Sequence, residues 1–155
     1  MRKHSPGRVG RIRRTGAAAV LSAGVLVLGM PSVGTASQAS GTPVTFSANP
    51  GYYRDYSTVV TYARSVAGYV YVESSPFKNL PAGWLGLYPR LYASNGALKT
   101  YGPWTYSPAN TAGMSASTFY NTTPGTSFYS HGMTQGWNGS KYVSHTTSRS
   151  PNQTV

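Results

Sequence analysis

The chain contains only two carboxylate side chains, those of Asp55 and Glu73. Most glycoside hydrolases need two carboxylic residues that flank the bond they cleave. Asp55 follows Arg54, as in a surface ion pair, and Glu73 ends a predicted strand. Nothing in the sequence brings the two acids together, so a small cell-wall hydrolase that uses them is kept only as an alternative hypothesis.

Serine and histidine are the other residues that could perform catalysis. Serines are abundant, but no G-x-S-x-G motif is present, and a triad would have to use His131 or His145 with one of the two acids. A two-residue turn at Asn138-Gly139 would place the histidines on opposite faces of a hairpin, where they cannot share a zinc ion. Cysteine and glycine-rich phosphate loops are absent. The sequence therefore predicts no catalytic residue, no metal ion and no cofactor.

The first 36 residues predict a secretory signal peptide. Residues 1–14 contain six Lys and Arg, and residues 16–30 form an almost wholly apolar run of 15 residues. This run is shorter than the ~20 residues that span a bilayer. Small residues follow, so we expect cleavage after Ala36 or after Ala39. The pair Arg13-Arg14 suggests export by the twin-arginine pathway. The next residues are not bulky and apolar, however, which favours the general secretory pathway. We therefore predict an extracellular protein without a membrane anchor after cleavage.

Removal of the leader changes the charge of the protein. Seven Lys and Arg then remain against two acidic residues, which leaves a net charge of +5. The basic residues are scattered, whereas nucleic-acid-binding proteins usually carry a basic stripe. The sequence thus predicts no nucleic-acid partner. A mild positive charge either favours anionic polymers such as wall teichoic acids or serves only to keep a secreted surface soluble.

The remaining chain predicts a small antiparallel β-sandwich, of immunoglobulin-like size, with about seven strands. It is rich in Tyr, Val, Thr and Ser, and Gly or Pro recurs every 8 to 12 residues. We expect a flexible N-terminal arm over 37–51 and a single domain over 52–155. The strands are expected at 57–73 (with a bend at Ala67-Gly68), 84–93, 97–106, 114–120, 126–137 and 140–147.

The segment WLGLYPRLYASNGALKTYGPWTY, residues 84–106, predicts a hairpin with two different faces. A two-residue turn at Asn95-Gly96 would pair Leu91 with Thr100 and Tyr92 with Lys99. Pro89 cannot donate a backbone hydrogen bond, which indicates an edge or a bulge. The apolar face would then hold Leu85, Leu87, Leu91, Ala93 and Leu98. The candidate binding residues on and beside the opposite face are Trp84, Tyr88, Arg90, Tyr92, Lys99, Tyr101 and Trp104. These rings could bind a partner or could be ordinary half-buried sheet residues.

The stretch PAGWLGLYPRLYASNGAL, together with GWNGSKY and SRSPNQ, resembles a group of small secreted β-rich proteins of actinobacteria, Streptomyces above all. The resemblance covers residues 58–153 and rests on turn and strand motifs. It implies secretion and a β-sandwich, and it carries no function. Members of that group often contain a cysteine pair, which this chain lacks.

The leading hypothesis from the sequence is a secreted, non-enzymatic binding module. Its target would be a protein partner or a cell-surface polymer. In one alternative the protein is an adaptor or inhibitor subunit of a secreted toxin or protease complex, and the arm over 37–51 adds a strand to its partner.

Overall fold

Strand is the only regular secondary structure in residues 36–48 and 51–155, which are the residues that the computed structural model describes. The predicted signal peptide lies outside them, apart from Ala36. No helix that could cross a membrane occurs in the described part of the chain. The prediction of an antiparallel all-β protein is therefore confirmed.

The number of strands differs from the expected seven, because 13 strands form three antiparallel sheets within residues 36–48 and 51–155. The long sheet contains β1 (Ser37–Ser40), β2 (Val44–Ala48), β3 (Gly51–Tyr62), β4 (Ser65–Ser75) and β9 (Gly113–Asn121). A second sheet contains β12 (Tyr142–Thr146), β11 (Met133–Trp137), β5 (Leu85–Tyr88) and β8 (Thr105–Tyr106). A third contains β13 (Gln153–Thr154), β10 (Ser127–Ser130), β6 (Arg90–Ala93) and β7 (Leu98–Tyr101).

The centre of the long sheet is the hairpin of β3 and β4, which pair along their whole length. We expected 57–73 to be too long for one strand and to be divided by a bend or a bulge at Ala67-Gly68. The chain instead reverses at Ala63-Arg64, two residues that carry no turn signal. In β4 the alternation is as predicted, because Val70 and Val72 are buried and the neighbouring tyrosines are half-exposed.

The segment 37–51 was expected to be a flexible arm, and this expectation was wrong. Its residues form β1 and β2, which pair one after the other with the same edge of β3. Ser37 also donates a side-chain hydrogen bond of 2.6 Å to Gln153 in β13. The segment belongs to the sheet because β3 is long enough to give both short strands a backbone partner.

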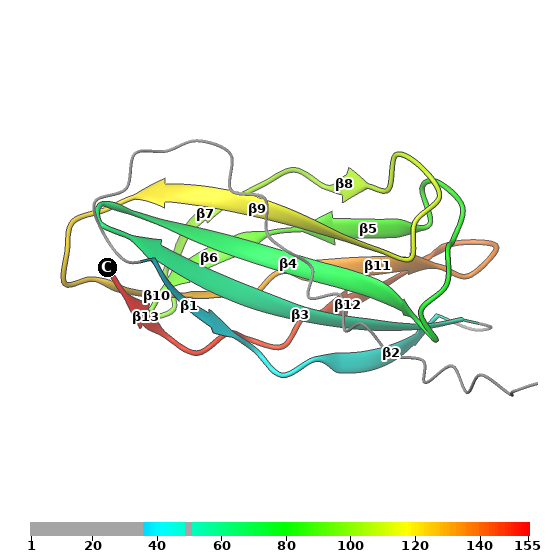
Figure 1. The fold of residues 1–155 in the computed structure, drawn as a ribbon, viewed down its shortest axis with the longest axis horizontal. Helices are drawn as coiled ribbons and strands as arrows, with labels where there is room; N and C mark the ends of the chain where they lie inside the picture. Colours follow the sequence, from blue (N-terminus) through cyan, green and yellow to red (C-terminus); the bar gives the residue numbers. More distant parts are fainter. Residues whose placement is uncertain (1–35, 49–50) are drawn as a thin grey trace, which may run out of the picture. The chain divides into compact units, whose positions relative to one another are not determined.

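The second and third sheets together form one interrupted layer. β5 continues into β6 after Pro89, and β11 follows β10 after His131-Gly132, so the strands break at a common level. β5 pairs with both β8 and β11, so it is not an edge strand; where an edge or a bulge was expected, Pro89 interrupts the strand. Figure 1 shows the two parts of this layer beside the unbroken β3 and β4.

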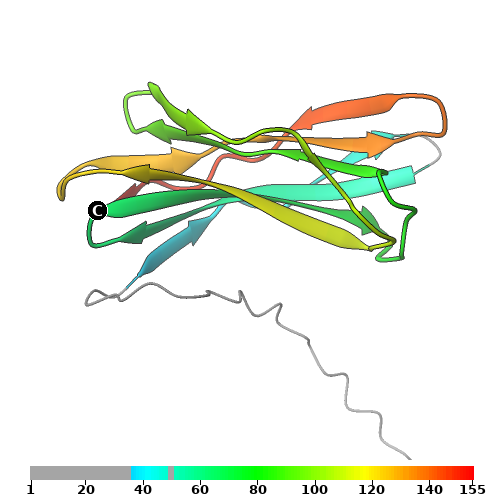
Figure 2. The same ribbon diagram turned by 90° about the horizontal axis from the view of Figure 1, so that it is seen from above.

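Two apolar clusters hold the interrupted layer against the long sheet. In the first, Val70 and Val72 of the long sheet pack with Leu85 and Leu87. The second cluster lies under the other half of the layer and comprises Val59, Val66, Leu91, Ala93 and Phe128. Figure 2, turned by 90°, shows the strands in two facing layers. The core predicted for the 84–106 hairpin is confirmed for Leu85, Leu87, Leu91 and Ala93.

The Asn95-Gly96 hairpin departs from its expected register near the turn. Ala93 donates to the carbonyl of Ala97, so three residues form the loop, and only Gly96 has a positive φ, of 88°. A bulge after Leu91 then restores the predicted pairing of Leu91 with Thr100. Tyr92 pairs with Leu98, not with Lys99. Leu98 consequently lies 48% exposed, and its predicted place in the core was wrong.

The Asn138-Gly139 hairpin also has a longer loop than predicted, of four residues. Trp137 pairs with Tyr142 and Thr134 with His145, so the register differs by two residues from the predicted one. A shift of two residues keeps each side chain on its face. The prediction that His131 and His145 lie on opposite faces of the hairpin therefore agrees with the structure.

Candidate functional site

The outer surface of the interrupted layer carries a continuous set of aromatic rings with two arginines among them. We call this surface the aromatic–cationic face. Strands β5 to β8 and β10 to β12, the segment between β7 and β8, and the segment that follows β12 supply its residues. They are Tyr88, Arg90, Tyr92, Tyr101, Trp104, Tyr106, Tyr129, Trp137, Tyr142 and Arg149.

One half of this face is an array of ring-to-ring contacts. Tyr88 stacks on Trp104 with ring centroids 5.3 Å apart, and Trp104 stacks on Tyr106 at 6.2 Å. Tyr106 continues to Tyr142 at 5.0 Å, and Tyr142 meets Trp137 edge-on at 5.0 Å. Gly86 makes room for this array, because a side-chain carbon there would lie 2.8 Å from the Tyr106 ring. The rings are therefore held as a surface by contact with one another.

The other half of the face adds positive charge. The Arg90 guanidinium lies between two rings, 6.0 Å from the centroid of Tyr88 and 5.8 Å from that of Tyr92. Tyr92 stacks on Tyr129 at 5.2 Å, and Arg149 covers Tyr129 at 3.6 Å. Such cation–π contacts contribute about 0.5–1 kcal/mol each at exposed sites. Arg149 is exposed and keeps its charge available to solvent, whereas Arg90 is half-buried and donates to the Gly132 carbonyl at 3.4 Å.

Neither carboxylate of the chain neutralises this charge. Asp55 is buried between the layers, and Glu73 pairs with Arg54 on the long sheet. The pKa of His131, whose ring lies 6.4 Å from Tyr92, is lowered by burial and then by the charges of Arg90 and Arg149. The positive charge of this region therefore comes from the arginines, while His131 is neutral at pH 7.

The structure brings five of the seven predicted binding residues into mutual contact: Tyr88, Arg90, Tyr92, Tyr101 and Trp104. Arg90 pairs with Tyr101 across the strands as predicted, but its guanidinium lies over Tyr88 and Tyr92. Lys99 is exposed and is not over the Tyr92 ring. Trp84 packs against the first core cluster instead. That these residues bind a partner stays a prediction.

Half of the residues on this face were not predicted from the sequence. Tyr106, Tyr129, Trp137 and Tyr142 all lie in strands, so a correct register for every strand would have placed them on one face. Arg149 follows β12 in an irregular segment, and no sequence pattern indicates where its side chain lies.

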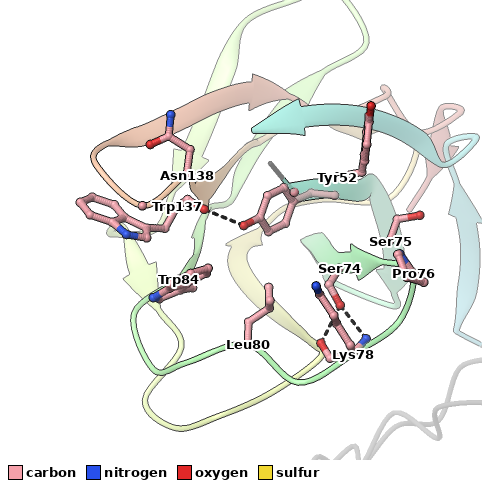
Figure 3. A pocket seen from close by; sticks show the side chains of 12 residues that line it. Tyr52, Ser74, Ser75, Pro76, Lys78, Leu80, Trp84, Trp137 and Asn138 are labelled. Carbon is pink, nitrogen blue, oxygen red and sulfur yellow. Dashed lines mark hydrogen bonds between the residues drawn. The ribbon is translucent and has the colours of Figure 1, made fainter. Parts of the chain in front are cut away.

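A pocket of about 380 Å³ opens where this face meets one end of the layers (Figure 3). Trp84 and Trp137 line one side, and Tyr52 and Lys78 also line it. Its buried lining includes Tyr53, whose hydroxyl donates to the Trp137 carbonyl at 2.8 Å. Trp137 thus belongs both to the aromatic–cationic face and to the pocket.

The interior holds a histidine–carboxylate pair that the sequence analysis did not expect. Asp55 is fully buried, and its Oδ2 accepts hydrogen bonds from the Thr134 hydroxyl at 2.5 Å and from His145 Nδ1 at 2.8 Å. Phe46 stacks on the His145 ring at 4.7 Å. The expectation that Asp55 pairs with Arg54 at the surface was wrong. The pair joins β3 to β11 and β12, and therefore connects the two layers.

The two carboxylates lie on opposite faces of the long sheet. Asp55 of β3 points into the interior, whereas Glu73 of β4 pairs with Arg54 and is partly exposed. A sheet therefore separates them, and they cannot flank one bond in the way that two carboxylic residues of a glycosidase do.

Comparisons of this chain with protein-family models, with curated proteins and with solved structures found no match. The resemblance to secreted actinobacterial proteins therefore stays a prediction.

Proposed function

We propose that the protein is a secreted β-sandwich that binds an anionic cell-surface polymer through its aromatic–cationic face, without catalysis. The observation that carries this proposal is the arrangement of Arg90 and Arg149 within an array of stacked rings, with no carboxylate on the same face. Flat rings suit the faces of sugar units, and the arginines suit carboxylate or phosphate groups along the polymer.

A polymer target is favoured over a protein partner by the shape and charge of this face. The array runs from Trp137 at one end to Arg149 at the other, along strands of both short sheets. A repeating ligand can use every ring in the array, whereas a protein interface concentrates its binding energy in a few anchors. The adaptor hypothesis relied on a flexible arm over 37–51, whereas β1 and β2 in this segment pair with β3 within the chain.

Binding to purified Gram-positive cell walls tests the proposal. The double variant Tyr101→Ala, Trp104→Ala should lower wall binding at least about tenfold, since truncation of an aromatic anchor costs more than ~1 kcal/mol. Walls extracted to remove anionic polymers should bind less wild-type protein, and added salt should weaken binding further. Phe119→Ala is the matched control, because Phe119 is 56% exposed on the long sheet.

Circular dichroism of each variant separates loss of binding from loss of fold. Full wall binding by a folded Tyr101→Ala, Trp104→Ala variant would refute the proposal. Equal binding to intact and extracted walls would refute the polymer target and leave a wall protein as the partner.

A further inference from the structure

Trp137 belongs both to the pocket and to the aromatic–cationic face. The other residues that line the pocket take no part in the proposed function. Its volume of about 380 Å³ falls within the 300–1,000 Å³ range of small-molecule sites. One sugar ring with a charged substituent is of a size that fits it. A longer stretch of polymer is too large, so the pocket differs in kind from the open face.

The lining combines rings, one cation and a few polar groups. Trp84, Trp137 and Tyr52 provide aromatic surface, and Tyr52 is 57% exposed. Lys78 is exposed and, within the described residues, forms no ion pair. Asn138 uses its side-chain oxygen to hold the hairpin loop, through the backbone N–H groups of Ser140 and Lys141. Its amide nitrogen is therefore the group left to donate to a ligand.

The base of the pocket is fixed by the fold. Ser74 accepts a hydrogen bond from the Lys78 backbone at 2.8 Å and donates to the Lys78 carbonyl at 2.7 Å. These two bonds hold the loop that carries Lys78 against the end of β4. Tyr53 and Leu80 are buried beneath. The pocket is thus largely formed before a ligand arrives, as small-molecule sites usually are.

We infer that this pocket binds the terminal sugar unit of the polymer, with the carboxylate or phosphate group of that unit beside Lys78. The inference rests on the proposed function, because the aromatic–cationic face would hold the chain that continues from this terminal unit past Trp137. The protein would then recognise polymer ends as well as polymer length.

Titration of the protein with glucose, glucuronic acid and glucose 6-phosphate tests the pocket. Tryptophan fluorescence and calorimetry measure the binding of each ligand. Both charged sugars should bind several-fold more tightly than glucose, because each brings an anion to Lys78. Lys78→Ala should remove that preference, and Tyr52→Ala should weaken the binding of all three ligands. Both side chains are exposed, so neither substitution should unfold the domain. The matched controls Arg64→Ala and Phe119→Ala remove an exposed cation and an exposed ring elsewhere, and they should change nothing.

Tighter binding of one charged sugar than of the other would identify carboxylate or phosphate as the terminal group. No saturable binding of any of the three ligands would overturn the inference, as would a charge preference that survives Lys78→Ala. The proposed function would still stand in that case if Tyr101→Ala, Trp104→Ala lowers wall binding. If the small ligands bind but the face variant keeps full wall binding, the proposed function fails, and the terminal-unit inference falls with it.

Discussion

The two layers of the protein both expose tyrosine, but only one of them combines rings with unneutralised charge. On the outer surface of the long sheet, Tyr56 stacks on Tyr71 at 4.7 Å and Tyr69 meets Phe119 edge-on. The charge there is the Arg54–Glu73 ion pair. The interrupted layer carries arginines without an acidic partner. Tyrosine content alone therefore does not mark a binding surface, since tyrosine suits any half-buried sheet position.

The layers also differ in continuity. β3 and β4 run without a break through the long sheet, whereas the facing strands break around Pro89 and His131-Gly132. At the break, the hydroxyls of Ser57 and Thr147 lie 2.5 Å apart, and both are within hydrogen-bonding distance of the Gly132 N–H. A polar contact therefore replaces apolar packing where the layer is interrupted.

A large loss of stability is expected from Gly132→Ala, which tests how closely the layers approach at the break. A side-chain carbon at this position would clash with Val70 and lie 2.7 Å from the Tyr88 carbonyl oxygen. We expect the free energy of unfolding to fall by about 3 kcal/mol, as in other overpacked interiors. Urea denaturation measures this change. Gly51→Ala in the long sheet is the matched control, because its nearest contact would be 3.4 Å, and it should change stability by less than about 0.5 kcal/mol. Equal effects would show that the break is not a close contact.

The next effect concerns the two histidines, one on each side of the interrupted layer. His145→Ala should lower the free energy of unfolding by about 1–3 kcal/mol, because it removes a hydrogen bond from the fully buried Asp55 carboxylate. His131→Ala, on the outer side of the interrupted layer, should lower the free energy of unfolding by less. Thermal and urea unfolding of both variants provide the measurement. A larger loss for His131→Ala would contradict the role of the Asp55–His145 pair in joining the layers.

Alkaline pH offers a test confined to the long sheet. Burial, followed by the hydrogen bond and charge of Tyr62 and the charge of Tyr71, raises the pKa of Tyr69 to about 12. In the unfolded chain tyrosine ionises near pH 10, so between pH 10 and 12 ionisation favours unfolding. The stabilising contribution is complete below pH 10 and is lost as the pH rises through 12. Tyr69→Phe should therefore lose stability less steeply than the wild type over this range, as measured by the unfolding midpoint. Identical slopes would contradict the raised pKa.

The smallest effect is expected from Leu98→Ala, which tests the register of the 84–106 hairpin. Leu98 is exposed beside Tyr92, so the substitution should change stability by less than about 0.5 kcal/mol. Leu91→Ala, in the same hairpin but fully buried, should cost about 2–5 kcal/mol. A loss of more than 1 kcal/mol for Leu98→Ala would show that Leu98 belongs to the core, as the sequence predicts.

The sequence predicted the fold class and most of the core, because β-strands leave a period of two that Leu85, Leu87 and Leu91 follow. It did not predict the turn at Ala63-Arg64, since neither residue needs an unusual backbone angle there. The arm over 37–51 was missed for a different reason. Short polar strands have little hydrophobic pattern. β1 and β2 form because the edge of β3 supplies backbone hydrogen-bond partners for them.

The candidate site was predicted only where one hairpin contained it. Tyr88, Arg90, Tyr92, Tyr101 and Trp104 come from neighbouring strands, so a local turn was enough to group them. The other part of the face needs the pairing of β5 with β11 and of β6 with β10. Those pairings join segments about 40 residues apart, between Leu91 and Ser130 for example, and no local pattern encodes them.

The first strand lies directly after the cleavage sites predicted for the signal peptide. β1 begins at Ser37, so the predicted cleavage after Ala36 leaves all four of its pairs with β3, whereas cleavage after Ala39 removes three of them. The stretch of β3 from Thr58 to Thr61 would then lose most of its partner and present an open edge. Open edges recruit strands from other molecules and promote aggregation. If the chain is cleaved as predicted, three residues at its new N-terminus would thus separate a chain that stays dispersed from one that self-associates, and the mass of the cleaved form would show which is made.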